Sequence, residues 1–242
     1  ADCTLATFSK SSLVGASLAG ADLGRATVTD CLTHKLDLCG AGLVLTHLLG
    51  ADLSASSLAG ATLDRTILID SDLTGADLRG VSMPNCQLTG AKLAGAVFDN
   101  AELAGCNFKD ADLQHASFAD AIIGSALFIA ADLRGARLVR ARLYQAQLTA
   151  ARLQGADLSG ADLQQCVFIS AQCHGSSFRQ ADLSFANFSH ADVSNADFSG
   201  ATLWRCRFHR SIESDTVFDA GRAVALGDDA AQAKAEAFSA SH

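Results

Sequence analysis

A strict five-residue period constrains this chain more than any other feature. The stretch from Ala151 to Leu163 reads ARLQGADLSGADL, and most of the sequence is a variant of the same unit. From Ala1 to Asp215 the register never slips, so this stretch contains 43 units. The third position of the unit is Leu, Phe, Val, Ile or Met in 39 of them, and the first is Ala, Ser, Thr or Cys in 41. Such uniformity indicates repeat architecture.

The period excludes a regular α-helix. Each repeat would move the third-position side chain about 140° around a helix, so the leucines would point in all directions. The two-residue alternation of a flat strand does not fit either. A solenoid does fit: if every five residues turn one corner, the first and third positions point inward and the others point outward. Glycine, which is frequent at the fifth position, suits a corner with unusual φ.

The phenylalanines predict four sides per coil. All but two of them occupy the third position and are separated by multiples of ten: Phe8, Phe98, Phe108, Phe118, Phe128, Phe168, Phe178, Phe188, Phe198, Phe208 and Phe218. Units therefore alternate between two kinds, and a coil has an even number of sides. Two sides could not enclose a core. We expect four sides and 20 residues per coil, with Phe on two opposite walls and Leu on the other two.

The repeat A(D/N)LXX resembles that of the pentapeptide-repeat family over about nine-tenths of the chain. The resemblance implies an all-β solenoid, a right-handed quadrilateral β-helix of about eleven 20-residue coils. At about 4.8 Å per coil, the rod would be about 50 Å long. We expect this β-helix over residues 1–220 and a C-terminal tail or cap, helical in part, over residues 221–242.

Both ends of a solenoid need covering. Asp228 or Asp229 is expected to N-cap a short Ala-rich helix that ends at Phe238. The side chains expected to cover the open end of the core are Val224, Leu226 and Phe238. Ala1 is already in register and is not a Met, so we expect an upstream segment, a further domain or a partner at the other end.

The eight cysteines behave as small apolar fillers. Five occupy the first position, namely Cys31, Cys86, Cys106, Cys166 and Cys206. Cys3 and Cys173 occupy the third position, and Cys39 lies outside both. We therefore expect reduced thiols and a cytoplasmic location. The chain has no apolar run of 18 residues and no signal-peptide pattern, so we expect no membrane span.

Two segments keep the five-residue register but have unusual residue types at some positions of the unit. Residues 31–50 have Thr33 at a third position and Leu36 at a first position. Residues 81–85 contain the single proline, Pro84, at a fourth position. Loop-like or bent coils and ordinary repeat drift both remain open for these segments.

No residue set predicts catalysis, a cofactor or a metal. Cys31, His34, Cys39 and His47 match no strong zinc spacing, and the coil geometry sends them in different directions. The carboxylates lie one per side, which does not imply a paired acid and base. The histidines form no Ser/His/Asp or Cys/His set. We expect no enzymatic activity.

Function is then expected on the outer surface, where charges form two groups. Residues 1–120 hold 7 Lys/Arg and 14 Asp/Glu, whereas residues 121–242 hold 11 and 12. An acidic ladder recurs at multiples of twenty and is interrupted by Lys92 and Arg152: Asp52, Asp72, Asp112 and Asp132. A basic band wraps several sides within about one coil, opposed by Asp132 alone: Arg134, Arg137, Arg140, Arg142 and Arg152. The band predicts an acidic protein partner, since an acidic rod is unsuited to nucleic acid.

Apolar residues at outward positions form the third group. An apolar wall lies at one phase of the coil: Ile67, Ile69, Leu127, Ile129, Val167 and Ile169, extended by His47 and Leu49. The adjoining side carries Val44, Ile122, Tyr144, Phe185 and Trp204. Exposed apolar surface often marks an interface. The alternative is that β-branched residues simply suit extended strands.

These observations favour a non-enzymatic protein-binding rod or scaffold. The family resemblance implies a second hypothesis, an acidic, dimeric rod that mimics DNA and binds a type II topoisomerase such as gyrase, with a homodimer formed through the C-terminal tail. A third is a repeat domain of a larger bacterial secretion-associated adaptor or toxin-immunity protein. The confined acidity, the basic band and the apolar wall argue against the DNA mimic.

Overall fold

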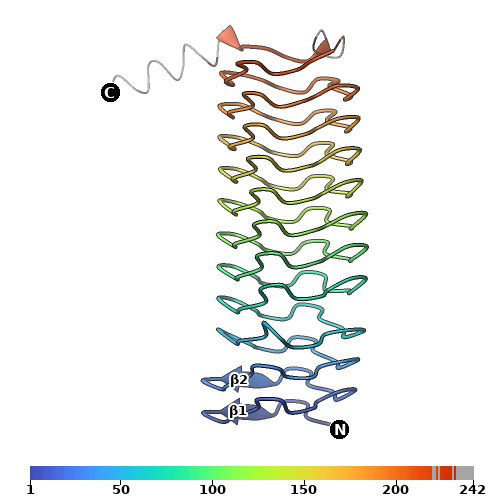
Figure 1. Ribbon diagram of the computed structural model, residues 1–242, viewed down its shortest axis with the longest axis vertical. Helices are drawn as coiled ribbons and strands as arrows, with labels where there is room; N and C mark the ends of the chain where they lie inside the picture. Colours follow the sequence, from blue (N-terminus) through green and yellow to red (C-terminus); the bar gives the residue numbers. More distant parts are fainter. Residues whose placement is uncertain (220–221, 223, 231, 233–242) are drawn as a thin grey trace, which may run out of the picture.

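The computed structural model shows a rod of stacked coils that runs from residue 1 at one end to residue 219 near the other (Figure 1). It describes residues 1–219, 222, 224–230 and 232. Two short strands, β1 (Thr7–Ser9) and β2 (Thr27–Thr29), pair in parallel. Elsewhere each side of a coil contributes one bridging residue, at the second position of the unit.

Successive coils are 20 residues apart. Bridges join residues that differ by 20, from Asp2 and Asp22 at the first coil to Asp197 and Val217 near the last. Bridging positions recur every five residues, so each coil has four sides. The four-sided coil predicted from the phenylalanine spacing is confirmed.

The corners impose one backbone conformation on every residue type. At the fifth position φ lies between 47° and 71° from Leu5 to Asp215, with Ala55 as the exception among the described residues. Glycine takes this left-handed conformation freely, but Leu, Lys and Arg adopt it here at a cost of about 1–2 kcal/mol each. The N–H of the next unit closes the corner by donating to the third-position carbonyl, as Ala26 does to Leu23 at 2.8 Å.

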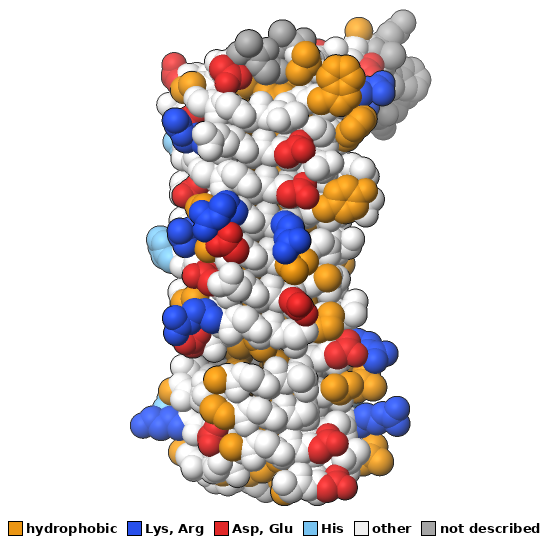
Figure 2. All heavy atoms as spheres, turned by 90° about the vertical axis from the view of Figure 1, so that its right-hand side faces the viewer, with side chains coloured by type: hydrophobic (Ala, Val, Ile, Leu, Met, Phe, Trp, Pro, Cys, Tyr) orange, Lys and Arg blue, Asp and Glu red, His pale blue; other side chains and the backbone are white. Residues whose placement is uncertain are grey.

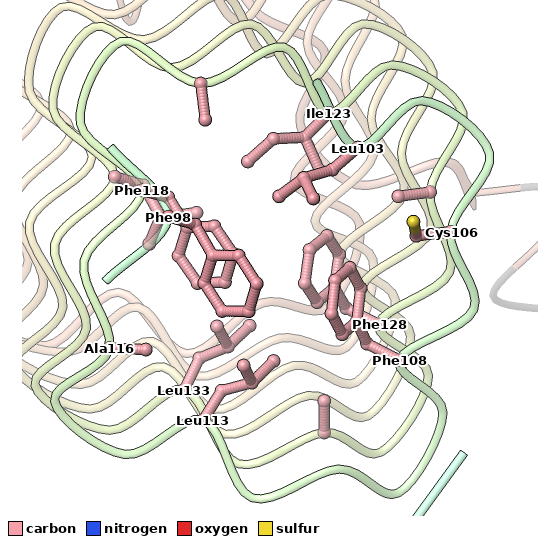
Figure 3. Packing of buried hydrophobic residues seen from close by; sticks show 14 of the residues in the cluster. Phe98, Leu103, Cys106, Phe108, Leu113, Ala116, Phe118, Ile123, Phe128 and Leu133 are labelled. Atoms are coloured by element: carbon pink, nitrogen blue, oxygen red, sulfur yellow. The ribbon is translucent and has the colours of Figure 1, made fainter. Parts of the chain in front are cut away.

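The core consists of stacked columns. Phe98 stacks on Phe118 with ring centroids 4.8 Å apart, and Phe108 stacks on Phe128 at 4.9 Å. Rings from the two columns meet edge to face at about 6 Å. The other two walls carry the aliphatic side chains labelled in Figure 3, Leu103, Ile123, Leu113 and Leu133. Phenylalanine on opposite walls is therefore confirmed.

The first position accepts Ala, Ser, Thr and Cys for a common reason. Its side chain lies against the carbonyl of the residue 23 earlier, and a hydroxyl or thiol donates to that oxygen. Thr46 Oγ1 donates to Leu23 O at 2.7 Å, and Cys166 Sγ donates to Leu143 O at 3.0 Å. All eight cysteines are free thiols, and those at positions 86, 106, 166, 173 and 206 are buried.

Neither irregular segment forms a loop. Pro84 fits because the fourth-position N–H takes no part in the ladder, and Pro84 O accepts a bond from Arg65 N at 3.0 Å. Residues 31–50 also keep the register, but the bridge expected between Leu32 and Asp52 is missing from the continuous series in the described chain. This second segment, which we call the bent coil, keeps its corner bonds and lacks one bridge, so it is not a loop.

The C-terminal end departs from the prediction. Val224 and Leu226 are 45% and 44% exposed, so they do not cover the core. Leu226 instead bridges Arg207, one residue out of the 20-residue register. The Arg222 guanidinium lies 4.8 Å from the Phe208 ring, partly covering the last coil.

Most of the helix predicted for the tail, including Phe238, lies outside the described residues. Asp229 Oδ1 accepts a bond from Gln232 N at 3.0 Å, which matches an N-cap. No helix in the described part of the chain is long and apolar enough to cross a membrane.

Candidate functional site

The apolar wall lies on a single side of the rod, as predicted. Bridges connect His47 to Ile67 and continue up this side through Leu127 and Val167. The six wall residues are half-buried rather than exposed, because each packs against the coils above and below. Amide side chains separate the apolar rows: Asn107 Nδ2 donates to Gln87 Oε1 at 3.1 Å. The wall is therefore striped, with no continuous apolar surface.

The adjoining side carries the exposed aromatic residues. Tyr144, Phe185 and Trp204 are 40%, 50% and 54% exposed. Figure 2 faces this side and shows large hydrophobic side chains along its upper right edge, next to a basic one. Tyr144 is satisfied locally, since its hydroxyl accepts a bond from Gln165 Nε2 at 3.0 Å. Trp204 and Phe185 lie on neighbouring coils and are joined by a backbone bond of 2.9 Å.

These two aromatic residues belong to a patch with two arginines. We call it the aromatic–arginine patch, and it consists of Phe185, Trp204, Arg205, Arg207 and Leu226. The Arg205 guanidinium lies 6.0 Å from the Phe185 ring centroid. A hollow of about 370 Å³ is lined by Phe185, Arg205, Arg207 and Leu226, together with Ala186 and Asn187. The prediction from sequence found the aromatic members but missed the two arginines, although Arg205 follows Phe185 by 20 residues.

Neither arginine of the patch has a carboxylate partner among the described residues. The basic band differs in this respect. Arg134 and Arg152 lie 2.7 and 3.0 Å from the Asp132 carboxylate, and Arg140 lies 2.7 Å from Asp120. The expectation that Asp132 alone opposes the band was wrong, because Asp120 lies one coil below Arg140.

The four aspartates of the acidic ladder lie on one side of the rod, and their carboxylates are engaged. Bridges join Asp52 to Asp72 and Asp112 to Asp132, with Lys92 between the pairs. In each of the four, Oδ1 accepts a bond of 3.0–3.2 Å from the backbone N–H two residues on. This N–H has no ladder partner, so the carboxylate completes the corner. The ladder therefore has a structural role.

Neighbouring cations further neutralise the ladder. The Lys92 ammonium lies 3.6 Å from Asp72. Burial opposes ionisation of Asp132, but the Arg134 hydrogen bonds and the charge of Arg152 outweigh it and lower the Asp132 pKa below 3.8. The ladder is thus not a free acidic track.

Cysteines and histidines are not assembled into a metal site. Within the described residues, no group of three or more His, Cys, Asp and Glu side chains could hold a metal ion. Cys31 Sγ donates to Thr29 O at 3.4 Å, His34 Nδ1 lies 3.5 Å from Asp52, and Cys39 Sγ lies 2.8 Å from Ser57 Oγ. These side chains have separate neighbours.

A family model of pentapeptide repeats matches the chain in 8 copies. The matched residues are 1–31, 46–83, 85–123, 126–165, 146–184 and 166–205. No curated protein sequence matches significantly.

Two solved structures are similar to this chain. HetL, a pentapeptide repeat protein involved in heterocyst differentiation regulation from the cyanobacterium Nostoc sp. strain PCC 7120, is 29% identical, with a TM-score of 0.52 over 83% of this chain and 88% of that one. QnrB1, a plasmid-mediated fluoroquinolone resistance protein, is 20% identical, with a TM-score of 0.45 over 95% of this chain and 94% of that one.

Proposed function

The chain belongs to the pentapeptide-repeat family, whose members form right-handed quadrilateral β-helices, and on that premise we propose that it is a non-enzymatic protein-binding rod. The observation that carries the proposal is the aromatic–arginine patch, where Phe185 and Trp204 are half-exposed beside a hollow. Aromatic and arginine side chains dominate the binding energy of protein interfaces. HetL, a relative involved in regulation, is compatible with a binding role.

The charges of the patch favour an acidic partner segment. Arg205 and Arg207 flank the hollow, and neither forms an ion pair within the described residues. A guanidinium binds a carboxylate through two parallel hydrogen bonds. The aromatic rings would bury apolar side chains of the same segment. We also propose a reducing compartment, the cytoplasm, because the eight cysteines are free thiols and most of them are buried.

The test is affinity capture with the immobilised full chain and two matched double variants. Phe185→Ser with Trp204→Ser removes the aromatic side chains of the patch, whereas Ile129→Thr with Ile169→Thr changes the striped wall. A partner that binds wild type and the wall variant, but binds the patch variant at least tenfold more weakly, supports the proposal. Loss of binding in the wall variant alone would transfer the interface to the wall. Circular dichroism of each variant controls for folding.

A second candidate is an acidic DNA-mimicking rod that binds a type II topoisomerase. The excess of acidic residues in the first half of the chain favours it, 14 against 7 basic residues over residues 1–120. The engaged carboxylates of the ladder argue against it. A gyrase supercoiling assay with added protein decides the question: neither inhibition nor protection from a quinolone at micromolar protein would exclude this candidate.

A further inference from the structure

Two adjoining sides of the rod each lose one bridge, at successive coils. Among residues 1–219, the bridge series is broken between Leu32 and Asp52 on one side and between Ser57 and Asp77 on the next. At the second break, the N–H groups of Leu58, Gly60 and Asp77 lack their usual ladder bonds. One coil later the corresponding groups make these bonds at 2.8–2.9 Å, namely Leu78, Gly80 and Val97.

The other two sides remain paired past both breaks. Bridges join Gly42 to Thr62 and Thr62 to Ser82 on one of them, and His47 to Ile67 and Ile67 to Gln87 on the other. Pairing is therefore lost only on the two broken sides. A hollow of about 390 Å³ occupies the second break, lined by Ala55, Ser56, Ser57, Ala59, Asp77 and Arg79. Figure 2 shows a crease in the lower part of the rod, with hydrophobic side chains visible inside it.

Three neighbouring departures from the repeat explain the break. Thr33 occupies a core position, and its Oγ1 donates to Asp52 O at 2.9 Å, taking the acceptor that its backbone N–H uses in a regular coil. Leu36 occupies a small position, and its N–H binds Ser56 Oγ at 2.9 Å. Ala55, the corner between the two breaks, lacks the left-handed φ of the other corners. The family model also skips residues 32–45.

We propose that the part of the rod containing the two breaks is a hinge, about which the coils on its N-terminal side bend relative to the rest of the rod. The two unbroken sides act as the pivot. Closing the second break would form three backbone bonds in place of bonds to water. Such an exchange changes the free energy little, so the two states are close in free energy. Bending changes the angle between the aromatic–arginine patch and the N-terminal surface around Leu5, Arg25 and Val44, which a rigid rod would hold fixed.

Amide hydrogen exchange and NMR relaxation dispersion on the full chain test the hinge. We expect the amides of Leu58, Gly60 and Asp77 to exchange at least tenfold faster than those of Leu78, Gly80 and Val97, which corresponds to about 1.4 kcal/mol. The same three amides should show millisecond dispersion. Equal protection in both groups, or fast exchange without dispersion, would overturn the proposal, because the latter describes a rigid gap.

Two double variants test whether Thr33 and Leu36 cause the hinge, or whether the amides exchange quickly only because they are exposed to water. Thr33→Leu with Leu36→Ala restores the repeat and should slow exchange at the three amides at least fivefold and suppress their dispersion. The matched control, Val81→Ala with Met83→Leu, changes the same two positions in a regularly paired coil and should leave those amides unchanged. Unaltered exchange in the first variant would contradict the assigned cause. If that variant does not fold, the wild-type measurements still decide the proposal.

Discussion

The coils at residues 85–205 and those at residues 31–80 obey the same five-residue register but hold together differently. In the former the ladder is continuous on all four sides, whereas in the latter two sides are open. Corners close in both regions, because the third-position carbonyl accepts its N–H in each, as Leu53 does from Ser56 and Phe118 does from Ala121. The comparison teaches that register and pairing are specified separately. Corners specify the register, and the volume of the core side chains specifies how closely the coils stack.

The largest expected loss of stability distinguishes the stacked core from the first coil. Phe118→Ala should lower the free energy of unfolding by about 3–5 kcal/mol, because the side chain is fully buried against Phe98. Phe8→Ala, in the first coil, should lower the free energy of unfolding by less than half as much, because Phe8 is only half-buried. Urea denaturation monitored by circular dichroism measures both. Equal losses would mean that the terminal coil is packed as firmly as the middle.

The corner carboxylates should matter equally in both regions. Asp192→Ala in a regular coil and Asp52→Ala in the bent coil should each cost about 1 kcal/mol at neutral pH, since each loses a bond to the N–H two residues on. The Asn variants should lose less, because Asn187 already makes this bond to Ser189 in the native chain. Thermal unfolding of the four variants measures the difference. A much smaller loss at Asp52 would show that the bent coil has weak corners as well.

The stability of the rod at low pH should depend on the same bonds between aspartate and backbone N–H. The Ser194 hydroxyl and backbone N–H lower the pKa of Asp192 below 3.8. A lowered pKa in the folded state contributes stability above the unfolded pKa, and this contribution is lost as pH falls through the folded value. Asp192→Asn should therefore flatten the decline of the melting temperature below about pH 4. An unchanged slope would contradict this assignment.

Replacing corner alanines by glycine should change the free energy of unfolding in opposite directions in the two regions. Ala130 has a φ of 56°, so Ala130→Gly should stabilise the rod by about 0.5–1 kcal/mol. Ala55 lacks a positive φ, so Ala55→Gly should destabilise it by a similar amount. Denaturant midpoints of the two variants against wild type measure both signs. A gain at Ala55 would mean that this corner visits the left-handed conformation.

The smallest effect concerns reactivity and leaves stability unchanged. A thiol reagent such as Ellman's should modify the half-buried Cys3, Cys31 and Cys39 quickly. The five buried thiols should react slowly, and burial raises the pKa of Cys166 to about 12. Two of the three reactive thiols lie at the bent coil. Rapid labelling of a fourth thiol would place an opening in the regular coils.

The architecture could be predicted from sequence because each of its rules is repeated dozens of times. Four sides, two phenylalanine columns and inward cysteines followed from the spacing alone. The hinge did not, because single departures are ambiguous: Val81 also breaks the small-residue rule, yet Thr62 and Ser82 remain bridged beside it. The ladder opens where Thr33, Leu36 and Ala55 depart from the repeat together.

The surface was harder to predict than the core. Residues 20 apart are neighbours on adjacent coils, as Asp120 and Arg140 or Phe185 and Arg205 are. The sequence predicts such proximity only after the coil length is known, and the predicted surface groups did not include these pairs. Leu226 pairs with Arg207 one residue out of the 20-residue register, which no repeat rule predicts.

The corner bond of aspartate has a consequence for how acidic rods of this kind are understood. Thirteen second-position aspartates, half of the 26 acidic residues, accept the N–H two residues on. Each brings a negative charge that asparagine would not bring. Much of the net charge of −8 is therefore a by-product of building corners. The overall acidity of such a protein therefore reflects how its corners are built more than what its surface binds.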